Sequence, residues 1–287
     1  MIDNEGWSLV GARMGPAALI IVAVAMLFSS AARALSSSAN CVFLSRFSGL
    51  DPLRLRNAME KTLRPAKPLD STSRLVYLPT ASFVYSSTSE KPKGEQRRRM
   101  RYEARAKAFL LAQGLGLDTT EKPLVLELDA PKLQQEDIRK VLTDAEVLYV
   151  EGGNTFYLHW VMLKTGFWDV AAPLLDSGKL VYMGASAGAI VAGTSIETAF
   201  WKGWDAPILP DMGMDDCVWN ADNLRGRSLV DFSLFMHYSE PEHAALVQTK
   251  KDTLPVVCVR DDSAILISAG AALELKGDGT IAPISLA

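Results

Sequence analysis

The sequence predicts an α/β fold whose mostly parallel sheet carries helices on both faces. Short apolar runs alternate along the chain with longer segments of helical pattern, which is typical of parallel strands joined by crossover helices. The length of 287 residues suits one large α/β domain or two small ones. Because the chain contains no internal repeat and no long linker, we expect one domain behind an N-terminal leader.

Strand-like and helix-like segments follow one another in a regular order. The first strands are predicted at residues 41–47, 74–78 (ended by Pro79), 124–128 and 146–150 (followed by Gly152 and Gly153). Helices are predicted at residues 52–63, 91–117 (ended by Gly114 and Gly116), 133–142 and 155–165. Further strands are predicted at residues 180–183 (followed by Gly184), 229–236, 256–259 and 264–267.

The basic stretch from Lys91 to Lys107 holds eight basic and two acidic residues. A charge run of this kind is typical of the solvated face of a helix, with Ala104, Ala108 and Leu111 facing inward. An anion-binding patch is the alternative interpretation.

The composition excludes several classes of protein. With 48% hydrophobic and 22% charged residues, the chain is neither disordered nor fibrous. Its 30 basic and 33 acidic residues give no support to nucleic-acid binding. An odd number of cysteines without a CxxC pair excludes a disulfide framework and a structural zinc site, and we expect no metal and no cofactor. The cysteines, which we expect to be buried or half-buried thiols, are Cys41, Cys217 and Cys258.

An apolar segment near the N-terminus predicts a targeting leader. Residues 17–28 read AALIIVAVAMLF and precede an A-x-A pattern at 32–34, as in a signal peptide. Residues 14–50 contain no Asp or Glu, which also suits an organelle transit segment. We expect residues 1–35 to be a cleaved leader, and residues 36–287 to form the domain. The alternatives are an uncleaved anchor that makes the only membrane contact and an extension of no consequence. The compartment is then the secretory pathway or an organelle, and otherwise the cytoplasm.

The segment Gly184-Ala185-Ser186-Ala187-Gly188 fits the pattern G-x-S-x-G between a strand and a helix. This is the context of a nucleophile elbow, in which a sharp turn exposes the serine hydroxyl above the sheet. The helix that follows presents free backbone N–H groups, and the N–H of Ala187 is placed to bind a developing oxyanion. The alternative is a turn rich in small residues selected only for close packing.

A second glycine turn, Glu151-Gly152-Gly153-Asn154-Thr155, ends the preceding strand. Adjacent glycines leave backbone N–H groups uncovered, so this loop is a candidate source of the second oxyanion donor and of substrate contacts. The alternative is a tight turn in which Asn154 or Thr155 caps the next helix.

A serine nucleophile needs a base, and the chain has only three histidines. His237 follows the strand-like run at 229–236, at the sheet edge where ligands of open α/β sheets bind. His243 lies in what we expect to be a polar loop beginning at Pro241, and His159 falls inside a predicted helix. His237 is therefore the favoured base.

Several carboxylates are candidates to orient that base. Asp261 and Asp262 follow the strand-like run at 256–259, Asp205 comes soon after the serine, and Glu240 lies close to His237 in sequence. Sequence alone leaves the choice open.

Four segments resemble peptidase family S51, which contains aspartyl dipeptidase (dipeptidase E) and cyanophycinase. They are LYVEGGNTFYL at 148–158, LVYMGASAGAIVAG at 180–193, FMHYS at 235–239 and VRDDSAIL at 259–266. The resemblance extends from Cys41 to the C-terminus. It implies a flavodoxin-like sandwich related to the class I glutamine amidotransferases.

The resemblance also implies roles. Ser186 would be the nucleophile and His237 the base, and Gly153 and Ala187 would donate the oxyanion hydrogen bonds. The acid falls on Asp205 by a dipeptidase-like assignment and on Asp261 by a cyanophycinase-like one.

Two departures from the family pattern bear on the substrate. Glu151 replaces the first glycine of the usual GGGNT loop, and Glu197 stands where we look for a substrate-binding arginine. No arginine lies between His237 and Lys250 either. Because a carboxylate repels an acidic substrate, cleavage after an N-terminal Asp is not the expected specificity.

The leading hypothesis is a serine peptidase that hydrolyses short peptides through a Ser-His-acid triad and an acyl-enzyme. One alternative is a catalytically silent binding module on the same fold. Another is an α/β-hydrolase esterase, which is disfavoured because no HGGG-type loop occurs early in the chain. A homodimer is a further expectation.

Overall fold

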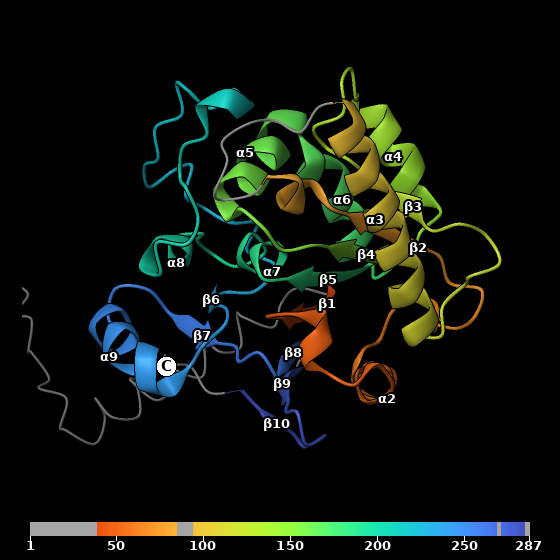
Figure 1. Cartoon of the computed structure of the whole chain (residues 1–287). Coiled ribbons are helices and arrows are strands. Elements are labelled where there is room, and N and C mark those ends of the chain that lie inside the picture. Colours follow the sequence, from red (N-terminus) through yellow and green to blue (C-terminus); the bar gives the residue numbers. More distant parts are fainter. Residues whose placement is uncertain (1–38, 85–93, 269–270, 285–287) are drawn as a thin grey trace, which may run out of the picture.

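The computed structural model describes residues 39–84, 94–268 and 271–284, so the predicted leader lies outside the described residues. An eight-stranded sheet of order β10-β9-β8-β1-β5-β4-β2-β3 forms the centre of the molecule (Figure 1). Its strands are β1 (Asn40–Leu44), β2 (Leu75–Leu78), β3 (Leu124–Val125), β4 (Val147–Val150), β5 (Val181–Ala185), β8 (Ala264–Ser268), β9 (Ala271–Leu275) and β10 (Ile281–Pro283).

Helices cover both faces of this sheet. They are α2 (Pro52–Thr62), α3 (Gly94–Gly114), α4 (Gln135–Thr143), α5 (Thr155–Thr165), α6 (Phe167–Asp176), α7 (Ala187–Ile190), α8 (Thr198–Trp201) and α9 (Glu240–Lys250), with short 3-10 turns η1 (Phe47–Gly49), η2 (Thr80–Phe83) and η3 (Pro210–Met212). Of the described helices, none has the length and apolar character that crossing a membrane requires.

Alternation along the strands divides the core into two layers. In β1, Val42 and Leu44 pack with α2 and α3 on one face, whereas Cys41 and Phe43 pack with α4 to α7 on the other. All of β1 is buried, as expected of a strand covered on both sides. The prediction of an α/β fold with helices on both faces of a mostly parallel sheet is confirmed.

Parallel pairing brings three strand ends to one edge. β1 pairs with β5 in a register that sets Leu44 opposite Ala185, and β4 pairs with β5 so that Val150 lies opposite Gly184. The residues that follow these strands, beginning with Ser45, Glu151 and Ser186, therefore meet at the carboxyl edge of the sheet. In open α/β sheets this edge is where ligands bind.

A second, two-stranded parallel sheet pairs β6 (Ser233–Phe235) with β7 (Val256–Cys258). Its apolar core joins Phe235 and Val256 to Val247 of α9, and Figure 1 shows α9 beside this small sheet. The runs predicted as strands at 229–236 and 256–259 are thus largely correct in place, although both strands are shorter.

The elements predicted from the sequence differ from the structure in two helical regions. Residue 241 does not begin a polar loop: Pro241 stands in the first turn of α9, which contains His243. Proline is favoured there because the first turn leaves its N–H groups unpaired in any case. Helix α6 was missed because Gly166, with φ of 62°, ends α5 and starts a new helix at once, and because Pro173 lies inside it.

The sheet also carries an antiparallel edge that the sequence did not predict. β8 pairs antiparallel with β1. β9 pairs antiparallel with β8, and β10 pairs antiparallel with β9. Mixed sheets of this kind are common among large α/β folds.

The basic helix α3 only partly fits the prediction of a solvated face. Ala104, Ala108 and Leu111 are buried as expected. Arg97, however, is only 8% exposed and forms ion pairs with Glu127 and Asp129 at 2.8 and 2.6 Å. The two carboxylates that follow β3 compensate the burial of this charge, which a pattern of helical charges alone does not reveal.

Candidate active site

The turn from β5 into α7 presents Ser186 at the carboxyl edge of the sheet. Its backbone has φ of 48° and ψ of −111°, a strained conformation for a residue other than glycine. Small neighbours make the turn sterically allowed. A Cβ at Gly188 would lie 2.2 Å from the carbonyl oxygen of Val150, and one at Gly184 would lie 2.5 Å from that of Gly188. The G-x-S-x-G segment therefore folds as the strand–turn–helix that its pattern predicts.

His237 lies opposite this serine. It follows β6, and its Nε2 is 2.9 Å from Ser186 Oγ. Its backbone also has a positive φ, of 54°, which is uncommon for a residue other than glycine. The Trp204 ring lies against the imidazole, with 5.8 Å between centroids.

Asp261 continues the chain of contacts. Its Oδ1 is 2.6 Å from His237 Nδ1, and its Oδ2 contacts the guanidinium of Arg46. A neutral imidazole that donates from Nδ1 to this carboxylate accepts at Nε2, which is the form able to take a proton from Ser186.

The electrostatic surroundings keep His237 neutral. Burial, assisted by the positive charges of Lys202 and Arg46, lowers its pKa to about 4. The Lys202 ammonium donates hydrogen bonds to the carbonyl oxygens of Met236 and His237, at 2.6 and 2.7 Å. Near neutral pH the imidazole is thus free to act as an acceptor.

The glycine loop after β4 lies directly against the serine. A Cβ at Gly152 would approach Ser186 Cβ to 2.9 Å, and Gly153 has φ of 140°, open to glycine alone in practice. Among the described residues, no acceptor bonds the backbone N–H groups of Gly153 and Ala187. Both N–H groups are therefore available to donate to a ligand oxygen, and that of Ala187 follows Ser186 directly.

Asn154, which we predicted among the substrate-binding residues, uses its side-chain amide in hydrogen bonds within the protein. Its side chain caps α5 by accepting the N–H of Tyr157 at 2.8 Å and donates to the carbonyl of Ala206 at 2.9 Å. Its position in the loop therefore follows the alternative interpretation, that of a helix cap.

The structure separates the two acids that the sequence left open. Asp261 bonds His237, whereas Asp205 Oδ2 accepts the backbone N–H of Thr155 at the start of α5, at 2.8 Å. Within the part of the chain that the structure describes, no hydrogen bond joins Asp205 to His237. Burial raises the pKa of Asp205, which lines the pocket beside the site.

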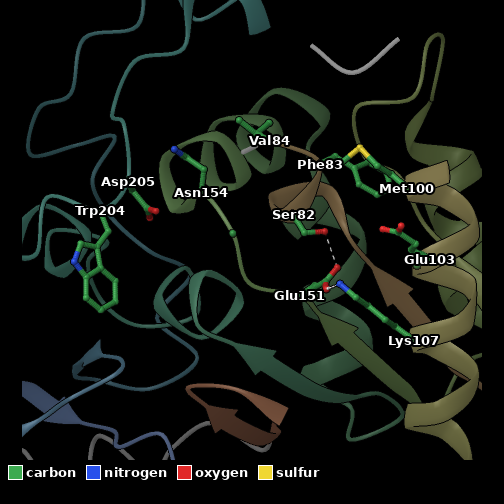
Figure 2. A pocket seen from close by; sticks show the side chains of 12 residues that line it. Ser82, Phe83, Val84, Met100, Glu103, Lys107, Glu151, Asn154, Trp204 and Asp205 are labelled. Carbon is green, nitrogen blue, oxygen red and sulfur yellow. Dashed lines mark hydrogen bonds and ion pairs between the residues drawn. The ribbon is translucent and has the colours of Figure 1, made fainter. Parts of the chain in front are cut away.

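Glu151, the departure from the family loop, is held by its neighbours. Its carboxylate accepts the Ser82 hydroxyl at 2.6 Å and contacts the Lys107 ammonium, as Figure 2 shows. Glu151 and Lys107 line two hollows, of about 320 and about 420 Å³. The larger also has Ser186 in its wall, and the smaller has Gly153 and Asp205, with Asp205 across the pocket from Glu151 in Figure 2.

The other histidines are placed away from this chemistry. His159 is 1% exposed in α5, and its Nε2 lies 2.9 Å from the carbonyl of Asn223. His243 accepts the N–H of Ser239 within α9. Across residues 39–84, 94–268 and 271–284, no group of His, Cys, Asp and Glu side chains is arranged to hold a metal ion.

Three residues around the site were not singled out by the sequence. Arg46 and Ser45 follow β1, far from the motifs along the chain, and Lys202 follows α8. No local pattern marks such residues, because their contacts arise only when β1, β6 and α8 are brought together. The sequence placed Ser45 and Arg46 inside the strand predicted at 41–47, whereas β1 ends at Leu44.

Comparisons with known proteins identify the family of this chain. The sequence profile described as peptidase family S51 matches residues 55–275, which is most of the chain. The protein belongs to peptidase family S51. Membership in this family places it among the peptidases, and the resemblance found in the sequence is confirmed.

Relatives within the family share moderate identity with this chain. An uncharacterized peptidase of Listeria monocytogenes is 30% identical over 174 residues, which are 61% of this chain and 70% of the relative. An uncharacterized peptidase of Pasteurella multocida is 28% identical over 169 residues, 57% of this chain and 72% of the relative. The peptidase E of Shewanella baltica is 34% identical over 165 residues, 53% of this chain and 63% of that enzyme.

A solved structure extends the comparison to the fold. The crystal structure of a Listeria monocytogenes protein proposed to be a peptidase E superimposes with a TM-score of 0.56 and 23% identity, covering 83% of this chain and 98% of that one. At this identity the likeness concerns the fold alone.

Proposed function

We propose that this S51 peptidase is a serine peptidase that hydrolyses short peptides, with Ser186 as nucleophile, His237 as base and Asp261 as the orienting acid. The continuous contact chain from Ser186 Oγ to His237 Nε2 (2.9 Å) and from His237 Nδ1 to Asp261 Oδ1 (2.6 Å) carries this proposal. Nucleophile, base and orienting carboxylate in this order are the recurring arrangement of serine hydrolases.

The reaction follows from these contacts. As Ser186 Oγ attacks the peptide carbonyl carbon, its proton moves to His237 Nε2, and the negative charge collects on the carbonyl oxygen. Collapse of this intermediate breaks the C–N bond, and His237 returns the proton to the leaving amine. A water molecule then repeats the sequence on the acyl-enzyme: His237 takes its proton, its oxygen attacks the ester, and the proton returns to Ser186.

The backbone stabilises the charge that develops. The N–H groups of Gly153 and Ala187, which no acceptor of the described residues bonds, are the donors that would bind the oxyanion. Removing one such donor in a serine hydrolase costs roughly 10²–10³-fold in kcat. Asp261 holds the imidazole and stabilises its positive charge while the proton resides there.

The surroundings of Ser186 favour small peptides without an acidic first residue. The two hollows of about 320 and about 420 Å³ are large enough for a few side chains. The larger one, which contains Ser186, also has Arg46 in its wall, and the guanidinium of Arg46 contacts Asp261. Glu151 and Asp205 line the smaller one, and Lys107, its basic residue, is already paired with Glu151. An acidic substrate side chain would meet repulsion there.

The alternatives fit less well. A silent binding module has no need of a Ser–His contact of hydrogen-bond length, and this protein has one at 2.9 Å. Membership in family S51 argues against an α/β-hydrolase esterase.

A peptide library tests the proposal. The full-length protein and Ser186→Ala are incubated with mixed dipeptides and tripeptides, including Asp-initiated ones, and products are read by mass spectrometry. We expect hydrolysis by the wild type, none by Ser186→Ala, and equal folding of both by circular dichroism. Cleavage that persists in the alanine variant would contradict the mechanism. No cleavage by folded wild-type protein would favour the binding module.

A further inference from the structure

The residues at the end of β1 contact each member of the Ser186–His237–Asp261 chain in turn. The carbonyl of Leu44 accepts the backbone N–H of Ser186 at 2.9 Å. The hydroxyl of Ser45 accepts the backbone N–H of His237 at 2.8 Å. The guanidinium of Arg46 contacts the carboxylate of Asp261. Three consecutive residues thus bind three groups that are distant from them and from one another in sequence.

Ser45 makes the central contact of this set. Its side chain is buried, with the residue 1% exposed, and both its donor and its acceptor are used. While accepting from His237, the hydroxyl donates to the carbonyl of Val259 at 2.8 Å. Val259 precedes Asp261 by two residues, so one hydroxyl joins the backbone of the base to the segment that carries the acid.

The site depends on a contact between the two sheets, because its residues come from both. Ser186 is carried by the main sheet, whereas His237 and Asp261 follow the two strands of the small sheet. His237 also has a positive φ of 54°, a conformation that surrounding contacts must hold in a residue other than glycine. A hydrogen bond to its own N–H acts directly on that strained residue.

The turn after these residues packs against the same acid. A Cβ at Gly49, at the end of η1, would lie 1.7 Å from the carbonyl oxygen of Asp261. The chain from Leu44 to Gly49 therefore contacts the serine, the histidine and the acid from one side.

We propose that Ser45 is a positioning residue of the reaction, which holds His237 in line with Ser186 through its hydrogen bonds to His237 and Val259. Leu44 holds Ser186 through its carbonyl, and Arg46 holds Asp261 through its guanidinium. This inference rests on the proposed function of the Ser186 site, since positioning has a kinetic effect only where His237 acts as base.

Kinetics of Ser45→Ala and Ser45→Thr in the full-length protein test the role. Without the hydroxyl, His237 loses the partner of its N–H, and we expect kcat to fall on the order of 10²-fold with KM unchanged, as for other small misplacements of catalytic groups. Ser45→Thr keeps the hydroxyl and should restore most of kcat. A folded Ser45→Thr variant as slow as Ser45→Ala would overturn the proposal.

Ser268→Ala is the matched control. Ser268 of β8 is 3% exposed, and its hydroxyl donates to the Asn40 side chain at the other end of β1, at 2.9 Å. The variant removes one buried hydroxyl hydrogen bond between β8 and β1, whereas Ser45→Ala removes two hydrogen bonds. We expect Ser268→Ala to lose stability to urea as Ser45→Ala does but to keep kcat. Equal losses of kcat in both variants would reduce Ser45 to a structural residue and overturn the proposal.

A spectroscopic measurement separates this inference from the proposed function. In protein labelled with ¹⁵N-histidine, the Nδ1–H signal of His237 reports its bond to Asp261 and is assigned with His237→Gln. We expect the signal to shift or broaden in Ser45→Ala and not in Ser268→Ala. If the wild type cleaves no peptide, the proposed function fails, and this signal still decides whether Ser45 positions His237. An unchanged signal in Ser45→Ala would overturn the inference.

Discussion

The serine side and the histidine side of the site are built in opposite ways. Ser186 belongs to one short segment of the main sheet, where β5, the turn and α7 follow one another within ten residues, 181–190. His237 and Asp261 are 24 residues apart and come from two strands of a separate small sheet. One side is a local structure, and the other is assembled from distant segments.

The two sides should therefore be sensitive to different kinds of substitution. The serine turn depends on close packing of small residues, so added volume at Gly188 damages it. The histidine side depends on polar contacts between segments, through Asp261, Lys202 and Ser45. Apart from substitution of Ser186 itself, substitutions that leave the fold intact should therefore change catalysis mostly from the histidine side.

The largest expected effect distinguishes the two acids. Asp261→Asn removes the carboxylate that fixes the tautomer of His237, and we expect kcat to fall by roughly 10²–10⁴-fold. Asp205→Asn keeps an oxygen to accept the N–H of Thr155, so we expect a much smaller loss. Steady-state kinetics on a peptide that the wild type cleaves provide the measurement. The reverse order of effects would assign the acid to Asp205.

A smaller effect, on folding, tests the packing of the serine side. Gly188→Ala places a methyl group 2.2 Å from the Val150 carbonyl, and we expect the free energy of unfolding to fall by about 1–3 kcal/mol. Gly203→Ala is the control near the histidine side: its φ of 63° is strained but its Cβ meets nothing within 4 Å, so about 1–2 kcal/mol is expected. Urea unfolding measures both, and an undisturbed Gly188→Ala would show that the turn adapts.

The smallest effect concerns the pH dependence set by Lys202. His237 must be neutral to act as base, so activity is lost as the pH falls through its pKa, which burial and the charges of Lys202 and Arg46 hold near 4. Lys202→Met removes one of these charges and should raise that pKa. The acidic limb of the kcat/KM profile then moves to higher pH. Lys202→Arg keeps the charge and should leave the limb in place; a limb that also stays in place in Lys202→Met would exclude this electrostatic role.

Much of the fold was predictable because its signals are local. Apolar runs marked β1, β2, β4, β5 and β8, and the end of α5 was placed correctly at Thr165. Helix α9 was not predicted, because Pro241 suits both a loop and a first helical turn. The strands β9 and β10 are the weakly buried antiparallel edge of the sheet, where the apolar signal is poorest.

Local sequence was sufficient to predict two parts of the site, the turn that carries Ser186 and the histidine that faces it. Small residues around Ser186, a strand before it and a helix after it are properties of neighbouring positions, and these act before any tertiary contact forms. His237 could be selected because only three histidines exist and one follows a strand.

The acid that contacts His237, and the residues that hold the two together, follow from the packing of distant segments. Asp205 and Asp261 are equivalent in a linear sequence, yet the pairing of β6 with β7 brings Asp261 to His237, while Asp205 meets the start of α5. Ser45 joins the site only because β1 lies between β5 and β8. Hydrogen bonds between distant segments depend on distance and direction in space, and the sequence spacing of these residues specifies neither.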